Sequence, residues 1–124
     1  MDYNKDNIFA KILRGEIPCN KVYENEHVIA FHDLHPSAPT HVLVLPKKEC
    51  MSFDDFVSTN DASTVDAFFK GVQKVASVLE LESSGYRLIM NHGSDASQTV
   101  PHFHVHILGK KKLGALVAGD EHHS

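Results

Sequence analysis

The chain has 124 residues, of which 42% are hydrophobic and 23% are charged. These values are typical of one soluble globular domain, and they exclude a disordered, collagen-like or coiled-coil chain. Sixteen acidic against twelve basic residues give a net charge of −4, which argues against nucleic acid as a partner. No apolar run approaches the ~20 residues that span a bilayer, and residues 1–6 lack the apolar core of a signal peptide. We therefore expect a cytoplasmic protein without a membrane partner.

The pattern of apolar and turn-forming residues predicts an α+β fold with a five-stranded antiparallel sheet and helices on one face. In chain order we expect a short helix over residues 8–13, strands over residues 22–24 and 28–31 joined as a hairpin, a loop over residues 33–39, a strand over residues 41–45, a long helix over residues 65–79, and strands over residues 86–91 and 102–108. The long helix has the strongest periodic signal, because its apolar residues fall on one face.

Cysteine and histidine usage narrows the possible chemistry. Cys19 and Cys50 lie 31 positions apart with no C-x-x-C spacing, which excludes the usual zinc-knuckle and redox motifs. The chain has ten histidines, and protonating all of them would change the net charge from −4 to +6. Stability and solubility should therefore depend on pH between about 5 and 7.

Three of the histidines alternate with apolar residues in the last expected strand. His102, His104 and His106 are separated by Phe103 and Val105. Alternate residues of a strand share a face, so the three imidazoles should lie about 6.7 Å apart on one face. The apolar residues between them should anchor the strand in a core, which makes it a rigid platform for chemistry.

Two kinds of chemistry fit this motif. A His-x-His pair with one further ligand, such as His41, forms a zinc site. Imidazoles also act directly, as nucleophile and acid, without a metal. Asp95 is the only carboxylate between Gly93 and Gly109, so partners that would orient metal-bound histidines are not evident. The residues alone leave both alternatives open.

Two other segments favour a nucleotide ligand. Residues 91–100, just before the histidines, are rich in small and hydroxyl side chains, and backbone N–H groups in such a loop can hold an anion. Asp33 follows the strand 28–31, where it could accept both hydroxyls of a ribose or only form the turn.

The histidine pattern resembles the histidine triad (HIT) family, and the similarity extends to residues 6–12, 15–18, 39–48 and 85–91. Within that family the chain is similar to the Hint branch, bacterial members included, which are purine nucleoside phosphoramidases. The resemblance implies one HIT domain over residues 1–124 with a C-terminal tail from about residue 113. It also implies a homodimer with a continuous sheet, in which the long helix and the strand 86–91 form the interface.

The resemblance further implies catalysis without a cofactor or a metal. One bacterial branch of the family holds zinc through a C-x-x-C in the first helix, and residues 7–10 of this chain contain no cysteine. Glu49 also stands where family members commonly have histidine. Pro101 replaces a common tyrosine, and Lys110 a usual glycine, which leaves the preferred leaving group open.

Carried over residue by residue, the resemblance makes His104 the nucleophile that attacks the α-phosphorus of a nucleoside 5′-phosphoramidate. Water then hydrolyses the nucleotidyl-histidine. His106 would bind the phosphoryl oxygens, His102 and His41 would orient the nucleophile, and Thr99 would help to protonate the leaving amine. The nucleotide-binding residues implied are Ile8, Phe9, Ile12, Ile17, Phe31, His32, Asp33, Leu34, Asn91, Ser97, Thr99, Val100, His104 and His106.

Two other functions compete with this one. A dinucleoside polyphosphate hydrolase belongs to a branch of the family with glutamine at the position of Asn91, so Asn91 favours the phosphoramidase. A nucleotide-binding or scaffolding module with incidental hydrolysis is the other alternative, although an intact triad favours catalysis. Because His104 must be uncharged to attack, activity should fall below about pH 6.

Overall fold

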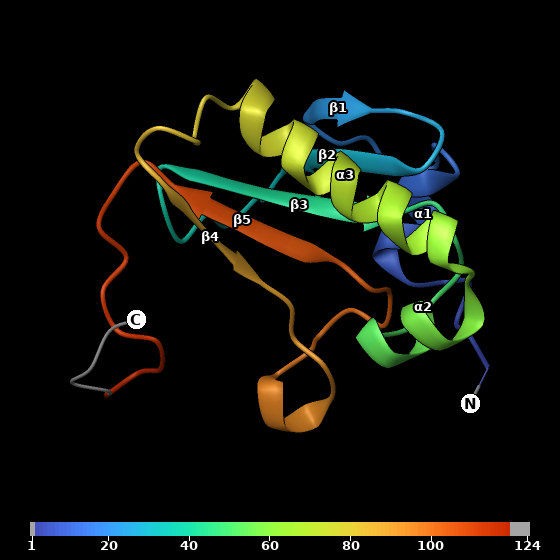
Figure 1. Ribbon diagram of the computed structural model, residues 1–124. Helices are drawn as coiled ribbons and strands as arrows, with labels where there is room; N and C mark the ends of the chain where they lie inside the picture. The colour runs from blue at the N-terminus through green and yellow to red at the C-terminus, as the bar shows by residue number, and fades with distance from the viewer. Residues whose placement is uncertain (1, 120–124) are drawn as a thin grey trace.

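Five strands form one sheet in the order β1-β2-β3-β5-β4, and every neighbouring pair is antiparallel. The structure is a computed structural model that describes residues 2–119 (Figure 1). Its elements are α1 (Ile8–Leu13), β1 (Lys21–Glu24), β2 (Val28–His32), β3 (Thr40–Pro46), α2 (Phe53–Thr59), α3 (Ala62–Val78), β4 (Tyr86–Ile89), the 3₁₀ helix η1 (Ser94–Ala96) and β5 (Val105–Gly109). The α+β class and the five-stranded antiparallel sheet are confirmed.

Side chains along each strand alternate between the two faces of the sheet, so the core has two layers. On one face, alternate residues of β2, β3 and β5 pack against Phe68, Val72 and Val75 of α3, which crosses the sheet in Figure 1. On the other face, Leu43 and its neighbours pack against Phe9 of α1. The prediction that the helices share one face is therefore wrong. The α1 face is the one that carries the site described below.

A second short helix, α2, lies where none was predicted, so the described residues form two short α-helices and one long one. The side chain of Ser52 caps α2 by accepting from the Asp55 amide, and Phe56 is the helix's one buried residue. Phe56 packs against Phe68 and Phe103 with ring centroids 5.1 and 5.2 Å away. The helix thus covers the end of the α3 layer, close to the start of β5.

The last strand begins at Val105, three residues later than predicted. Pairing between β3 and β5 runs only as far as Val44 opposite Val105. Further along β3, Pro46 has no N–H to donate, and the Phe103 amide donates to the Cys50 carbonyl outside the sheet. Only His106 of the three alternating histidines therefore lies within the strand.

No helix in the described part of the chain is long and apolar enough to cross a membrane. The expected C-terminal tail is described as far as residue 119, and residues 120–124 lie outside the described structure. Within the tail, the carbonyls of Gly114 and Ala115 accept hydrogen bonds from the Arg87 guanidinium on β4.

Candidate active site

A pocket of about 370 Å³ lies between α1 and the sheet. This volume is within the range of small-molecule sites. Twelve of the fourteen predicted nucleotide-binding residues line it, namely Ile8, Phe9, Ile12, Ile17, Phe31, His32, Asp33, Leu34, Thr99, Val100, His104 and His106. Five further lining residues were not among the predicted nucleotide-binding residues: Pro18, Cys19, Asn20, His35 and Leu43. The predicted residues Asn91 and Ser97 are not among the residues that line it.

Helix α1 forms one wall because its start is fixed by a cap. The buried Asn7 side chain accepts from the Ala10 amide at 2.9 Å, and its own amide group donates to the Asn4 carbonyl. This cap satisfies a backbone N–H of the first turn. It also sets the helix so that Phe9 lies edge-on to the His104 ring, with centroids 4.9 Å apart.

The hydrogen bonds of His104 fix the position of its proton. Its Nδ1 lies 2.7 Å from the His102 carbonyl oxygen. A carbonyl can only accept, so Nδ1 carries the hydrogen and Nε2 has a free lone pair. Burial lowers the pKa of His104 below its usual value, although the bond to the His102 carbonyl opposes this shift. His104 is therefore uncharged at neutral pH, with the lone pair of a nucleophile.

His106 has the opposite tautomer, which is set by His41. The Ser37 amide donates to His41 Nδ1 at 3.0 Å, so the hydrogen of a neutral His41 is on Nε2. This Nε2 lies 2.8 Å from His106 Nδ1 and donates to it. The hydrogen of His106 is consequently on Nε2, where it can be donated to an anionic oxygen. The rings of His104 and His106 are 5.1 Å apart, so a lone pair and an N–H donor lie side by side.

Burial also keeps His106 uncharged before a ligand binds. Burial first, and then the nearby His104 and His41, lower the pKa of His106 to about 4. Asp33 opposes this shift through its negative charge. The Asp33 carboxylate lies 3.5 Å from His41 Nε2 and accepts a hydrogen bond from the His35 amide. Asp33 thus lines the pocket and also contacts the His41 ring, which orients His106.

His102 does not share the pocket with the other two histidines. It is fully buried, it does not line the pocket, and its Nε2 donates to the Pro46 carbonyl at 3.0 Å. Burial lowers the pKa of His102 to about 4. The predicted row of three imidazoles is thus wrong: His104 and His106 reach the pocket, and His102 supports His104 through its backbone carbonyl.

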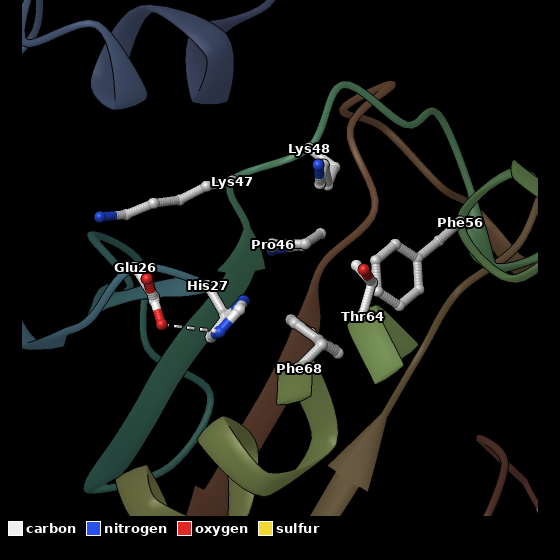
Figure 2. A pocket seen from close by; sticks show the side chains of 8 residues that line it. All are labelled: Glu26, His27, Pro46, Lys47, Lys48, Phe56, Thr64 and Phe68. Atoms are coloured by element: carbon white, nitrogen blue, oxygen red, sulfur yellow. Dashed lines mark ion pairs between the residues drawn. The ribbon is translucent and has the colours of Figure 1, made fainter. Parts of the chain in front are cut away.

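Pro46 also lines another, smaller hollow of about 170 Å³. Figure 2 shows it at the end of β3, where Lys47 and Lys48 follow Pro46 and the aromatic rings of Phe56 and Phe68 close one side. It contains none of the pocket histidines. It is relevant to the site only through the Pro46 carbonyl, which His102 uses.

A metal does not suit these histidines. Asp33, His41 and His106 place ligand atoms within 4.8 Å of one another, which is the spacing of a possible cation site. A metal on His41 Nε2, however, would require the ring hydrogen on Nδ1, where it would meet the Ser37 N–H. A zinc site that uses the His102 ring also fails, since His102 Nε2 is directed at the Pro46 carbonyl. The arrangement fits proton transfer better than metal binding.

The loop before the histidines holds its own shape through Gln98, which is not one of the predicted site residues. The Gln98 side chain accepts from the Gly93 amide and donates to the carbonyls of Met51 and Val100. The amides of Ser97 and Gln98 bond within the loop, to Ser94 and Gly93. These three N–H groups are therefore not available to an anion, contrary to expectation. The loop instead presents Thr99 and Val100 to the pocket.

Comparison with known proteins finds a matching family and several similar structures. A family model for the HIT domain matches residues 14–113. A histidine triad protein from Clostridium difficile is 43% identical, with a TM-score of 0.82 over 93% of this chain and 98% of that one. A HIT family hydrolase from Legionella pneumophila is 36% identical, with a TM-score of 0.80 over 88% and 96% of the two chains. A histidine triad nucleotide-binding protein from Candida albicans is 31% identical, with a TM-score of 0.73 over 82% and 73%.

Proposed function

The chain belongs to the HIT domain family, and on that premise we propose that it hydrolyses the P–N bond of purine nucleoside 5′-phosphoramidates. The observation that carries this proposal is the pair of opposite tautomers at the pocket. His104 offers a lone pair on Nε2, and His106 offers an N–H donor beside it. A nucleophile next to a donor for the phosphoryl oxygens is what attack at phosphorus requires.

The reaction takes place in two displacements. His104 Nε2 attacks the α-phosphorus, a new P–N bond forms to the imidazole, and the P–N bond to the amine breaks. The amine leaves with its electron pair and takes a proton. Water then attacks the same phosphorus and returns a proton to the groups that protonated the amine, the bond to His104 breaks, and the nucleoside monophosphate is released. The Nδ1 hydrogen bond to the His102 carbonyl stabilises the positive charge that forms on His104 in the first step.

Proton delivery to the leaving amine is the role we assign to Thr99. Amines leave poorly unless protonated, so an acid or a relay must lie near the nitrogen. Thr99 lines the pocket together with His106. His106, in turn, is hydrogen-bonded to His41, which contacts Asp33. This series of groups can supply a proton and redistribute charge after the amine has left.

The apolar wall of the pocket suits a nucleobase. Ile8, Phe9, Ile12 and Phe31 line it, and Phe9 and Phe31 contact each other edge to face. A flat, apolar base would bury its surface there, and Asp33 would accept the ribose hydroxyls. The name of the Candida albicans relative, a nucleotide-binding protein, supports the same ligand class.

The homodimer is part of this proposal and rests on the free edge of the sheet. β4 is an edge strand, and Tyr86, Leu88 and Met90 are each about 40% exposed. Apolar side chains on an unpaired edge favour association. Leu88→Lys should therefore yield a monomer by light scattering, whereas Leu116→Lys in the exposed tail should not.

The test measures turnover of adenosine 5′-phosphoramidate in EDTA by the wild type and by His104→Ala. We expect a metal-independent reaction that falls by roughly 10³-fold or more in the variant. Faster turnover of a dinucleoside polyphosphate would support the rival hydrolase. Binding of the nucleotide without turnover would support the binding module, and either result would refute the proposal.

A further inference from the structure

The segment ahead of α1 reaches the histidines through one side chain, that of Tyr3. The Tyr3 hydroxyl lies 2.6 Å from His102 Nδ1, and the two residues are 99 positions apart in the sequence. The phenol ring stands edge-on to the imidazole, with centroids 5.6 Å apart. The histidine motif by itself does not predict this contact, because Tyr3 lies 99 positions before His102 and does not line the pocket.

The direction of this hydrogen bond follows from the other side of the ring. His102 Nε2 donates to the Pro46 carbonyl, which can only accept. Because burial keeps His102 uncharged, its Nδ1 has no hydrogen and must accept from the Tyr3 hydroxyl. Burial also raises the pKa of Tyr3, so the phenol keeps the proton that it donates. Both ring nitrogens of His102 are therefore fixed by defined partners.

The N-terminal segment is itself anchored, so Tyr3 is held in place. The Asn7 side chain donates to the Asn4 carbonyl at 2.8 Å, and the Arg14 guanidinium donates to the Lys5 carbonyl at 2.8 Å. These bonds attach the segment to α1, the helix that also supplies Phe9 to the pocket. Because these bonds already order the segment, little further conformational entropy is lost when the Tyr3 hydroxyl bonds to His102.

We propose that Tyr3 is a positioning residue for the nucleophile His104. The Tyr3 hydroxyl and the Pro46 carbonyl hold the His102 ring from both sides, which fixes the backbone of His102. The carbonyl of that same residue accepts the Nδ1 hydrogen of His104 at 2.7 Å. Groups that hold a reacting side chain in its productive geometry strengthen catalysis without touching the substrate. The inference rests on the proposed function, in which His104 attacks phosphorus.

The test compares Tyr3→Phe with Tyr23→Phe. The first variant removes the hydroxyl that bonds to His102, and the second removes one that accepts a hydrogen bond from the Asn25 side chain, at 3.4 Å. In Tyr3→Phe the buried Nδ1 of His102 loses its hydrogen-bond donor, so the His102 carbonyl positions His104 less firmly. We therefore expect kcat to fall roughly tenfold with KM unchanged. The acid limb of the pH profile should move to lower pH, because the bond that raises the pKa of His104 loosens. Tyr23→Phe should match the wild type.

Nitrogen-15 NMR of the histidine rings supplies a readout that does not depend on turnover. In the free wild-type protein, we expect His102 to show an unprotonated Nδ1 that accepts a strong hydrogen bond, and Tyr3→Phe to shift it. Unchanged ring nitrogens and unchanged kcat in Tyr3→Phe would overturn the inference. A lower melting temperature with wild-type nitrogens and kcat would assign Tyr3 a structural role only. Shifted nitrogens in a protein that cleaves no phosphoramidate would refute the proposed function and leave the positioning intact.

Discussion

The buried, uncharged state of His102 predicts how the stability of the protein depends on pH. In the unfolded chain the residue has the ordinary histidine pKa of about 6.5, whereas burial lowers it to about 4 in the folded protein. Between these values the unfolded chain binds more protons, so stability is fully present above pH 6.5 and is lost as the pH falls toward 4. From pH 7.5 to pH 4.5 this one group should lower the free energy of unfolding by about 2.5 kcal/mol.

The assay is urea unfolding at both pH values for the wild type, His102→Gln and His27→Gln. The glutamine at position 102 keeps an amide donor for the Pro46 carbonyl but binds no proton in this range. It should lower stability at pH 7.5 and reduce the loss on acidification by about 2.5 kcal/mol. His27 is exposed, so its variant should keep the full loss. A wild-type pH dependence in His102→Gln would refute the reasoning.

Three further predictions concern catalysis and packing. The acid limb of kcat/KM should lie below pH 6.5, because burial lowers the pKa of His104 and only the uncharged imidazole attacks; a limb above pH 6.5 would contradict this. Thr99→Val should slow substrates with alkylamine leaving groups more than those with aniline leaving groups, which need less protonation; an equal reduction would remove Thr99 from the proton path. Gly71→Ala should lower the free energy of unfolding by about 1–2 kcal/mol, because its Cβ would lie 2.7 Å from a Val28 methyl, whereas exposed Lys74→Ala should have little effect in the same urea assay.

The fold was predictable wherever local periodicity matched the tertiary structure. Val72 and Val75 recur at helical spacing and lie on the buried face of α3. The helix α2 could not be predicted in this way, because only Phe56 of its seven residues is buried. One buried residue cannot show a helical spacing of apolar positions, and the Ser52 cap alone does not distinguish a helix from a turn.

Most of the pocket was predicted, but the arrangement of the histidines was not. The alternation of His102, His104 and His106 predicts a continuous strand, yet Pro46 on the neighbouring strand ends the pairing, and the Phe103 amide bonds to Cys50. Such long-range partners have no signature in a single sequence. The same applies to the contact of His41 with His106, which joins residues 65 positions apart.

Gln98 shows a further limit of pattern-based prediction. The small and hydroxyl residues around it predicted a loop open to an anion, whereas its side chain closes that loop on itself through three hydrogen bonds. Composition indicates that a loop can bind an anion. Whether its N–H groups are free depends on contacts such as the one with Met51, which is 47 residues away.

The central claim is that His104 becomes covalently bonded to phosphorus, and the stereochemical course of the reaction tests this most directly. Hydrolysis of one diastereomer of adenosine 5′-phosphorothioamidate in oxygen-18 water gives a chiral product whose configuration can be determined. Two successive displacements, by His104 Nε2 and then by water, predict overall retention at phosphorus. Inversion would mean that water attacks directly, and it would contradict nucleophilic catalysis by His104.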